Sequence, residues 1–170
     1  MSAVSLWRIG SDSGEFRADD LSGAGAEKYG GRFNSAGKGT FVVYASAHPA
    51  LTVLETLVHM GTRAKAGRAN RYLIELTVPT KIFNARQVLT IADLLAAGYF
   101  SWDAVPFSNA AQAVGDQFVA KAGSLLLQLP SAIIPHEAVP DVNFLINPRH
   151  PDFYRTQVVR REKYTYDPRL

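Results

Sequence analysis

Short apolar runs, separated by glycine- and proline-rich stretches, dominate the pattern of hydrophobic and polar positions along this chain. Residues 5–9 (SLWRI), 40–45 (TFVVYA) and 71–78 (RYLIELTV) are rich in β-branched and aromatic residues, so each predicts a strand. Residues 142–146 (VNFLI) predict another strand, which ends at Asn147–Pro148.

The remaining apolar runs lie in the C-terminal half. Residues 124–129 (SLLLQL) and 131–135 (SAIIP) predict two strands separated by Pro130, and residues 157–165 (QVVRREKYT) predict a last strand at a sheet edge. Residues 11–39, in contrast, are rich in Gly, Ser and Asp and predict a long loop. Loops of that length are often functional.

Between Pro49 and Met60 the apolar residues recur with the period of a helix, which predicts a helix there. Ser46 is expected to cap this helix, Pro49 suits its first turn, and Gly61 is expected to end it. The apolar stripe expected to face the core consists of Leu51, Leu54 and Val58.

Two further helices are marked by their caps. Thr90 begins a short helix over residues 91–97, with Asp93 completing a partial capping box. Ser108 begins a longer helix from Asn109 to about Ala122. Strands outnumber helices and do not alternate regularly with them, so we expect an α+β fold with mixed, mostly antiparallel sheets and flanking helices.

Composition narrows the class of protein. The chain has 170 residues, of which 47% are hydrophobic and 19% charged, so a single globular domain over residues 1–170 is expected. The net charge of +3 is modest, and the densest basic run, Arg160–Arg161, is followed by Glu162. We therefore expect no direct nucleic-acid binding. The absence of cysteine excludes disulfides and thiol nucleophiles.

The N-terminal segment, Met1–Gly10, does not have the pattern of a signal peptide, and no apolar run approaches the roughly 20 residues that span a bilayer. These observations predict a cytoplasmic protein that does not associate with membranes. The histidines at 48, 59, 136 and 150 form no HExxH motif, so we expect no metal site.

One candidate site is the segment KYGGRFN at residues 28–34. Its two glycines permit close approach of a ligand to the backbone. Arg32 could bind phosphate oxygens with both arms of its guanidinium, and Tyr29 could stack on a flat ring. The alternative is an ordinary surface turn with a solvated arginine.

A second candidate site joins Tyr44, at the end of a strand, to Glu55 on the following helix. Glu55 borders the predicted buried stripe, where a carboxylate is partly shielded from water. The alternative is an i,i+4 pair between Glu55 and His59 on the helix surface. Ser131, at the break between two apolar runs, could satisfy turn backbone or take part in chemistry, but no His–acid pair supports a serine hydrolase.

Several motifs stand in a characteristic order between about residues 6 and 153: LWRI, YGGRFN, VVYAS, ALTVLE, Trp102, Gly115–Asp116, LPSAIIP and NFLINP. In order and spacing they resemble the RES domain, a family named for an Arg, a Glu and a Ser. Arg32, Glu55 and Ser131 stand at these three positions, which the resemblance implies are catalytic. Its aromatic positions match Tyr29 and Tyr44, Asn143 is a weaker match, and Phe118 lies near the place of a frequent tryptophan.

The resemblance implies a single RES domain with residues 154–170 as a C-terminal strand and tail, and a fold similar to ADP-ribosyltransferases. RES proteins are toxins of two-gene systems, partnered by an Xre-like helix-turn-helix antitoxin, which we expect to cover the active site. They degrade NAD⁺ by hydrolysis or phosphorolysis, and some relatives ADP-ribosylate a protein, so NAD is expected as a substrate and not as a prosthetic group.

Assigned to this chemistry, Glu55 would stabilise the cationic ribose and Arg32 would bind the pyrophosphate. Tyr29 or Tyr44 would pack on nicotinamide or its ribose, and Ser131 would hydrogen-bond the ribose or the nicotinamide amide. An RNA-cleaving toxin and a non-catalytic binding module remain alternatives.

Overall fold

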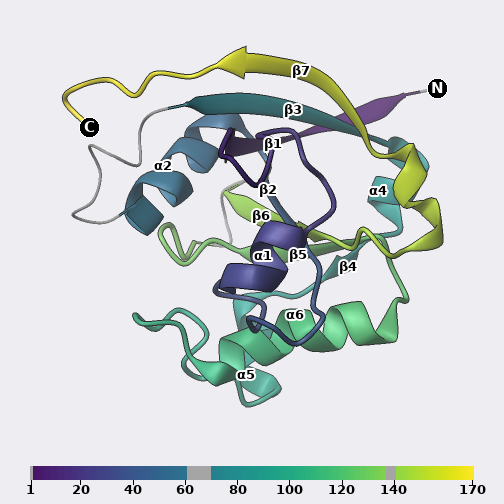
Figure 1. Cartoon of the computed structure of the whole chain (residues 1–170). Helices are drawn as coiled ribbons and strands as arrows, with labels where there is room; N and C mark the ends of the chain where they lie inside the picture. The colour runs from purple at the N-terminus through teal and green to yellow at the C-terminus, as the bar shows by residue number, and fades with distance from the viewer. Residues whose placement is uncertain (1, 61–69, 137–140) are drawn as a thin grey trace.

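A single seven-stranded sheet forms the centre of the molecule in the computed structural model, which describes residues 2–60, 70–136 and 141–170 (Figure 1). The strand order is β4-β5-β6-β2-β1-β3-β7, and among these strands every neighbouring pair is antiparallel except β4–β5. The strands are β1 (Ala3–Ser11), β2 (Val43–Ser46), β3 (Arg71–Pro79), β4 (Gln87–Val88), β5 (Leu126–Pro130), β6 (Val142–Ile146) and β7 (Gln157–Lys163). The predicted α+β fold with mostly antiparallel pairing is confirmed.

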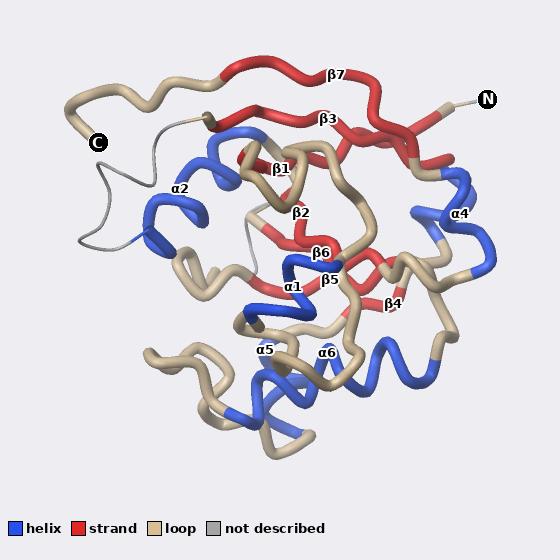
Figure 2. The backbone as a smooth tube through the Cα atoms, in the orientation of Figure 1, coloured by secondary structure: helices blue, strands red, loops and turns tan. Residues whose placement is uncertain are grey.

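Helices flank this sheet on both faces (Figure 2). Within the described residues, no helix is long and apolar enough to cross a membrane. Two predicted caps are present: Ser108 accepts a hydrogen bond from Ala111 N, and Thr90 forms a complete capping box with Asp93. The helices are α1 (Ala24–Tyr29), α2 (Pro49–Met60), α4 (Thr80–Asn84), α5 (Ile91–Ala96), α6 (Asn109–Lys121) and the 3₁₀ turn η2 (Pro151–Arg155).

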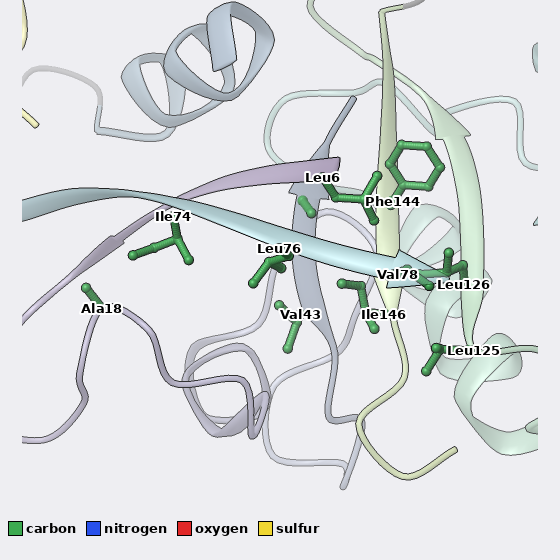
Figure 3. Close-up of a cluster of buried hydrophobic side chains, with 11 residues drawn as sticks. Leu6, Ala18, Val43, Ile74, Leu76, Val78, Leu125, Leu126, Phe144 and Ile146 are labelled. Carbon is green, nitrogen blue, oxygen red and sulfur yellow. The ribbon is translucent and has the colours of Figure 1, made fainter. Parts of the chain in front are cut away.

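The two faces of the sheet carry separate hydrophobic cores, because successive side chains on a strand point to opposite faces. One core joins Leu6, Val43 and Ile146 to the apolar side chains of β3 (Figure 3). The other packs Leu127 and Leu145 against α5 and α6, which lie together on the side of the molecule away from β7 (Figure 1). Both cores hold the central strands rigidly in place.

The sheet opens between its two central strands. In the register between β1 and β2, only Trp7 pairs with Ser46. Beyond this pair the strands separate, whereas β1 continues to pair with β3 along its whole length, from Ala3 to Ser11. The separation leaves a cleft that both strands line.

Several sequence predictions are corrected at the element boundaries. Residues 11–39 are not wholly loop, because they contain α1. Residues 131–135 do not form a strand: the Ser131 hydroxyl accepts the N–H groups of Ile133 and Ile134, which turns the chain out of the sheet. The predicted last strand is confirmed as β7 at the sheet edge.

The helix from Pro49 to Met60 is confirmed with the predicted bounds, but its cap and buried face differ from the prediction. The Ser46 hydroxyl bonds to the Asn143 side chain, and the N–H of Leu51 is instead accepted by His48 Nδ1. Leu51 is buried as expected. Leu54 and Val58, however, are 37% and 56% exposed, because the face turned inward is the polar one. The predicted end at Gly61 lies outside the described residues.

Candidate active site

A cavity of about 440 Å³ lies where β1 and β2 separate. This volume is in the range of small-molecule sites, which is about 300–1,000 Å³. Its walls come from β1, β2, β6, the inner face of α2, and the segment from Phe16 to Phe33 that includes α1. The cavity contains Tyr29, Arg32, Tyr44, Glu55 and Asn143 among its lining residues, so five of the six predicted site residues meet there.

Glu55 is the centre of a hydrogen-bonded group in this cavity. Its Oε1 accepts hydrogen bonds from Ser131 Oγ at 2.8 Å and from Asn143 Nδ2 at 2.5 Å. The three residues come from α2, from the turn after β5, and from β6. The hydrogen bonds within the described residues reach only Oε1, so Oε2 of this cavity-lining carboxylate has no partner among those residues.

The two donors to Glu55 are themselves fixed. Ser131 is fully buried, and its Oγ also accepts two backbone N–H groups at 3.1 Å each. Asn143 lies opposite Ser46 in the β2–β6 register, and Ser46 Oγ donates to Asn143 Oδ1 at 2.7 Å. That bond orients the amide so that its NH₂ faces Glu55. Ser131 therefore satisfies backbone N–H groups of the turn and also donates a hydrogen bond to the Glu55 carboxylate.

Arg32 is not the solvated arginine of an ordinary turn. The residue is only 9% exposed, and its Nη1 donates to the carbonyl oxygens of Trp102 at 3.2 Å and Ala104 at 2.9 Å. Its guanidinium lies 4.8 Å from the centre of the Phe107 ring. Burial lowers the pKa of Arg32, and the nearby charge of Glu55 opposes this. The arginine therefore provides an oriented positive charge beside the carboxylate.

The two tyrosines differ in their surroundings. The Tyr44 hydroxyl donates to Asn34 Oδ1 at 2.8 Å and accepts from Phe33 N at 3.1 Å, and burial raises its pKa. It holds the arginine-bearing turn against β2. Tyr29 is 67% exposed at the rim of the cavity, and its hydroxyl donates to Glu15 Oε2.

Helix α6, which carries the sequence motif Gly115–Asp116, also holds the turn that contains Arg32 in place. Asp116 accepts hydrogen bonds from Ser35 N at 3.0 Å and Ser35 Oγ at 2.6 Å. Burial acts to raise the pKa of Asp116, but the hydrogen bonds from Ser35 and Thr40 and the charge of Lys38 together lower it. Gly115 lies against the carbonyl of Phe33. The motif therefore positions the segment that carries Arg32.

A polar pattern in the sequence marks the inner face of α2, but the prediction based on the apolar stripe overlooked it. Thr52, Glu55, Thr56 and His59 recur at i, i+3, i+4 and i+7, and all four line the cavity. The proposed Glu55–His59 side-chain pair is not formed, since His59 Nδ1 bonds to the Glu55 backbone oxygen. Ser46 and Arg8 were also missed as cavity residues. Among the described residues, no group of three His, Cys, Asp or Glu side chains could hold a metal ion.

Comparison with known proteins identifies the family. The model of the RES domain matches residues 5–167. The chain belongs to the RES domain family. It is 39% identical over 167 residues to a protein of Sphingobium sp. (strain YBL2) named Prs ADP-ribosylating toxin, covering 98% of this chain and 96% of that protein. A protein of Pseudomonas putida named Toxin Res is 32% identical, with 97% and 98% of the two chains covered.

A solved structure supports the fold of this RES-domain toxin. The crystal structure of the M. tuberculosis MbcT–MbcA toxin–antitoxin complex contains a chain that matches with a TM-score of 0.73. The match covers 96% of this chain and 85% of that one, at 17% sequence identity. At this identity the match shows that the two chains share a fold.

Proposed function

We propose that this RES toxin cleaves the nicotinamide–ribose bond of NAD⁺. The observation that carries the proposal is Glu55, whose carboxylate is fixed through one oxygen by Ser131 and Asn143 and lies in a cavity beside Arg32. A carboxylate held in advance, where positive charge will develop, is the main requirement for breaking a glycosidic bond through a cationic ribose.

In the proposed reaction, the bond between C1′ of the ribose and the pyridinium nitrogen breaks. Its electron pair leaves with nicotinamide, which departs neutral, and C1′ acquires oxocarbenium character. The free oxygen of Glu55 accepts a hydrogen bond from a ribose hydroxyl and places negative charge next to that cation. Water or phosphate then bonds to C1′ and loses a proton, which gives hydrolysis or phosphorolysis.

The other site residues hold the substrate. Arg32 binds the pyrophosphate, and Tyr29 or Tyr44 packs against nicotinamide or its ribose. The complete burial of Ser131 and its bond to Glu55 favour a role for this serine in positioning the carboxylate over direct contact with substrate. Asn143 orients the carboxylate in the same way from β6.

The test is to incubate the purified protein with NAD⁺ and, separately, with RNA, each with and without phosphate. We expect release of nicotinamide together with ADP-ribose, or with its 1″-phosphate when phosphate is the acceptor, and intact RNA. Cleavage of RNA with unchanged NAD⁺ would support the RNA-cleaving alternative and refute the proposal. A protein that cleaves neither would be a non-catalytic binding module, which the presence of a cavity with a fixed carboxylate argues against.

A second candidate is transfer of ADP-ribose to a protein. It is favoured by the Sphingobium relative, whose name describes an ADP-ribosylating toxin and which is 39% identical over nearly the whole chain. Both reactions share the cleavage step and differ only in the acceptor. Incubation of a cell lysate with labelled NAD⁺ separates them, since transfer leaves label on a protein band and hydrolysis leaves it in solution.

The partner that we propose is an Xre-like antitoxin that covers the cavity in the cytoplasm. The structural neighbour comes from a toxin–antitoxin complex. On α2, the exposed Leu54 and Val58 lie beside the cavity residues Glu55 and His59, so a partner seated there would also block the site. Replacing Val58 by Asp should weaken neutralisation by the antitoxin at least 10-fold, while NAD⁺ cleavage by the free toxin persists. Unchanged neutralisation would locate the contact elsewhere.

A further inference from the structure

Arg8 lies in β1 next to the paired residue Trp7 and lines the cavity, although nothing in the chemistry proposed for Glu55 uses it. Its Nη1 donates to the backbone oxygen of Asp20 at 2.8 Å. Its Nε is buried and has no hydrogen-bond partner among residues 2–60, 70–136 and 141–170. A buried donor without a partner costs about 1–3 kcal/mol, and more when it belongs to a charged group. A guanidinium that is left partly unpaired and that lines a cavity favours an anionic ligand there.

The surroundings of Arg8 leave its charge only partly compensated. Burial lowers the pKa of the Arg8 guanidinium, and the carboxylates of Asp20 and Asp19 oppose that effect. No ion pair within 4.0 Å involves Arg8 among the described residues. Asp19 is already bonded to Arg17, and Asp20 accepts hydrogen bonds from Ser22.

The cavity as a whole has an excess of positive charge. Four arginines line it, against two carboxylates. Arg17 is 76% exposed at its side chain and paired with Asp19, whereas Arg8 and Arg32 each donate hydrogen bonds to backbone oxygens that orient the guanidinium. Two guanidinium groups match the two negative charges of a pyrophosphate, which arginine binds through paired N–H donors. The four arginines are Arg8, Arg17, Arg32 and Arg71, and the carboxylates are Asp20 and Glu55.

The strand geometry sets Arg8 apart from Glu55. Side chains alternate along β1, so Trp7 and Arg8 point to opposite faces of the strand. Ser46, paired with Trp7, belongs to the hydrogen-bonded group around Glu55. Since β1 and β2 separate beyond this pair, the cavity is lined by both Trp7 and Arg8. A ligand whose sugar lies at Glu55 can therefore extend past the edge of β1 to Arg8.

We propose that Arg8 forms a phosphate subsite, in which its guanidinium arms bind the pyrophosphate of the dinucleotide together with Arg32. This inference rests on the proposed function and adds a residue to it. Arg32 serves the end of the pyrophosphate nearest the ribose at Glu55, and Arg8 serves the end nearer the adenosine half. The loss of one charge-assisted contact of about 1.5–3 kcal/mol corresponds to a roughly 10- to 100-fold change in affinity.

The experiment measures the affinity of ADP-ribose by calorimetry, and the KM and kcat for NAD⁺, in the whole protein and in three variants. Arg8→Gln should weaken ADP-ribose binding and raise KM about 10- to 100-fold, with kcat changed less than about threefold. Arg8→Lys keeps the positive charge but loses the two-armed guanidinium, so we expect an affinity for ADP-ribose between those of wild type and Arg8→Gln. Arg86→Gln is the matched control and should behave as wild type, because Arg86 likewise donates from Nη1 to a backbone oxygen, that of Phe83, but does not line the cavity.

A purely structural role for Arg8 would lower thermal stability and kcat and leave the KM of the folded fraction unchanged, and that pattern would overturn the inference. So would wild-type affinity for ADP-ribose in Arg8→Gln. If that variant does not fold, wild-type affinity and wild-type salt dependence in Arg8→Lys would overturn it equally. Arg8-dependent binding of ADP-ribose without consumption of NAD⁺ would sustain the subsite while refuting the proposed function.

Discussion

Gly115 allows a sharp test of how α6 positions Arg32. In an exposed helix, replacing Gly by Ala stabilises by about 1 kcal/mol. Here a Cβ on residue 115 would lie 1.7 Å from the carbonyl oxygen of Phe33, 2.9 Å from its carbon and 3.0 Å from Leu145 Cδ1. Contacts of Cβ below 3.0 Å are essentially never seen, so the Phe33 carbonyl must recede by about 1.3 Å.

The expected effect on activity exceeds the effect on stability. Overpacking costs about 1–3 kcal/mol, so the helix gain of about 1 kcal/mol leaves Gly115→Ala destabilised by about 0–2 kcal/mol. The displaced carbonyl belongs to the residue that follows Arg32, and a misplacement of about 1 Å near a site can reduce rate about 100-fold. We expect cleavage of NAD⁺ to fall about 10- to 100-fold in a protein that still folds.

The assay pairs urea denaturation with initial rates of nicotinamide release. Gly123→Ala is the control, since Gly123 has no atom within 4 Å of an added Cβ and is not among the glycines with positive φ. Its stability should stay within about 0.5 kcal/mol of wild type, with full activity. A Gly115→Ala protein that is about 1 kcal/mol more stable than wild type and fully active would refute the reasoning.

Three further substitutions test the supports of the site. Ser131→Ala removes a hydrogen-bond donor to Glu55 and leaves two backbone N–H groups without a partner, so urea denaturation should show a loss of about 1–3 kcal/mol in the free energy of unfolding. We also expect kcat to fall at least 10-fold, and an unchanged kcat would contradict the positioning role. Arg32→Ala should raise KM for NAD⁺ at least 10-fold, and a normal dissociation constant for ADP-ribose would show that Arg32 does not bind the pyrophosphate. Tyr44→Phe leaves the buried N–H of Phe33 unpaired, so thermal denaturation should show a loss of about 1–3 kcal/mol, whereas wild-type stability would mean that the turn is held without this hydroxyl.

The parts of the fold that the sequence predicted well are those set by local patterns. Strands at 5–9, 71–78 and 142–146 combine β-branched residues with turn residues at their ends, and the structure places β1, β3 and β6 there. The boxes and caps at Thr90 and Ser108 are local hydrogen bonds, which is why the starts of α5 and α6 were predictable.

The errors arose where hydrogen bonds that the hydrophobic pattern does not reveal override local preference. Residues 131–135 are apolar enough for a strand, but the hydroxyl of Ser131 binds the following N–H groups and so competes with sheet pairing. Helix α1 has no side-chain cap, and Gly23 before it is in the left-handed region, so no local cap signal marks where the helix begins.

The candidate site was predictable only in part, for the same reason. Glu55 lies 76 residues from Ser131 and 88 from Asn143, and no spacing rule links them. Resemblance to the RES domain nominated these residues one by one. Their convergence depends on three strands and α2, as does the entry of Arg8 into the cavity where β1 and β2 separate.

The central claim is that the fixed carboxylate at position 55 drives cleavage of the nicotinamide–ribose bond. The most direct measurement is the rate of nicotinamide release from NAD⁺ by purified wild type and by Glu55→Gln, a substitution of nearly the same shape, with folding of both checked by circular dichroism. We expect a loss of at least about 100-fold in the folded variant, because an amide cannot stabilise the cationic ribose as a carboxylate does. Full turnover of NAD⁺ by folded Glu55→Gln would contradict the account.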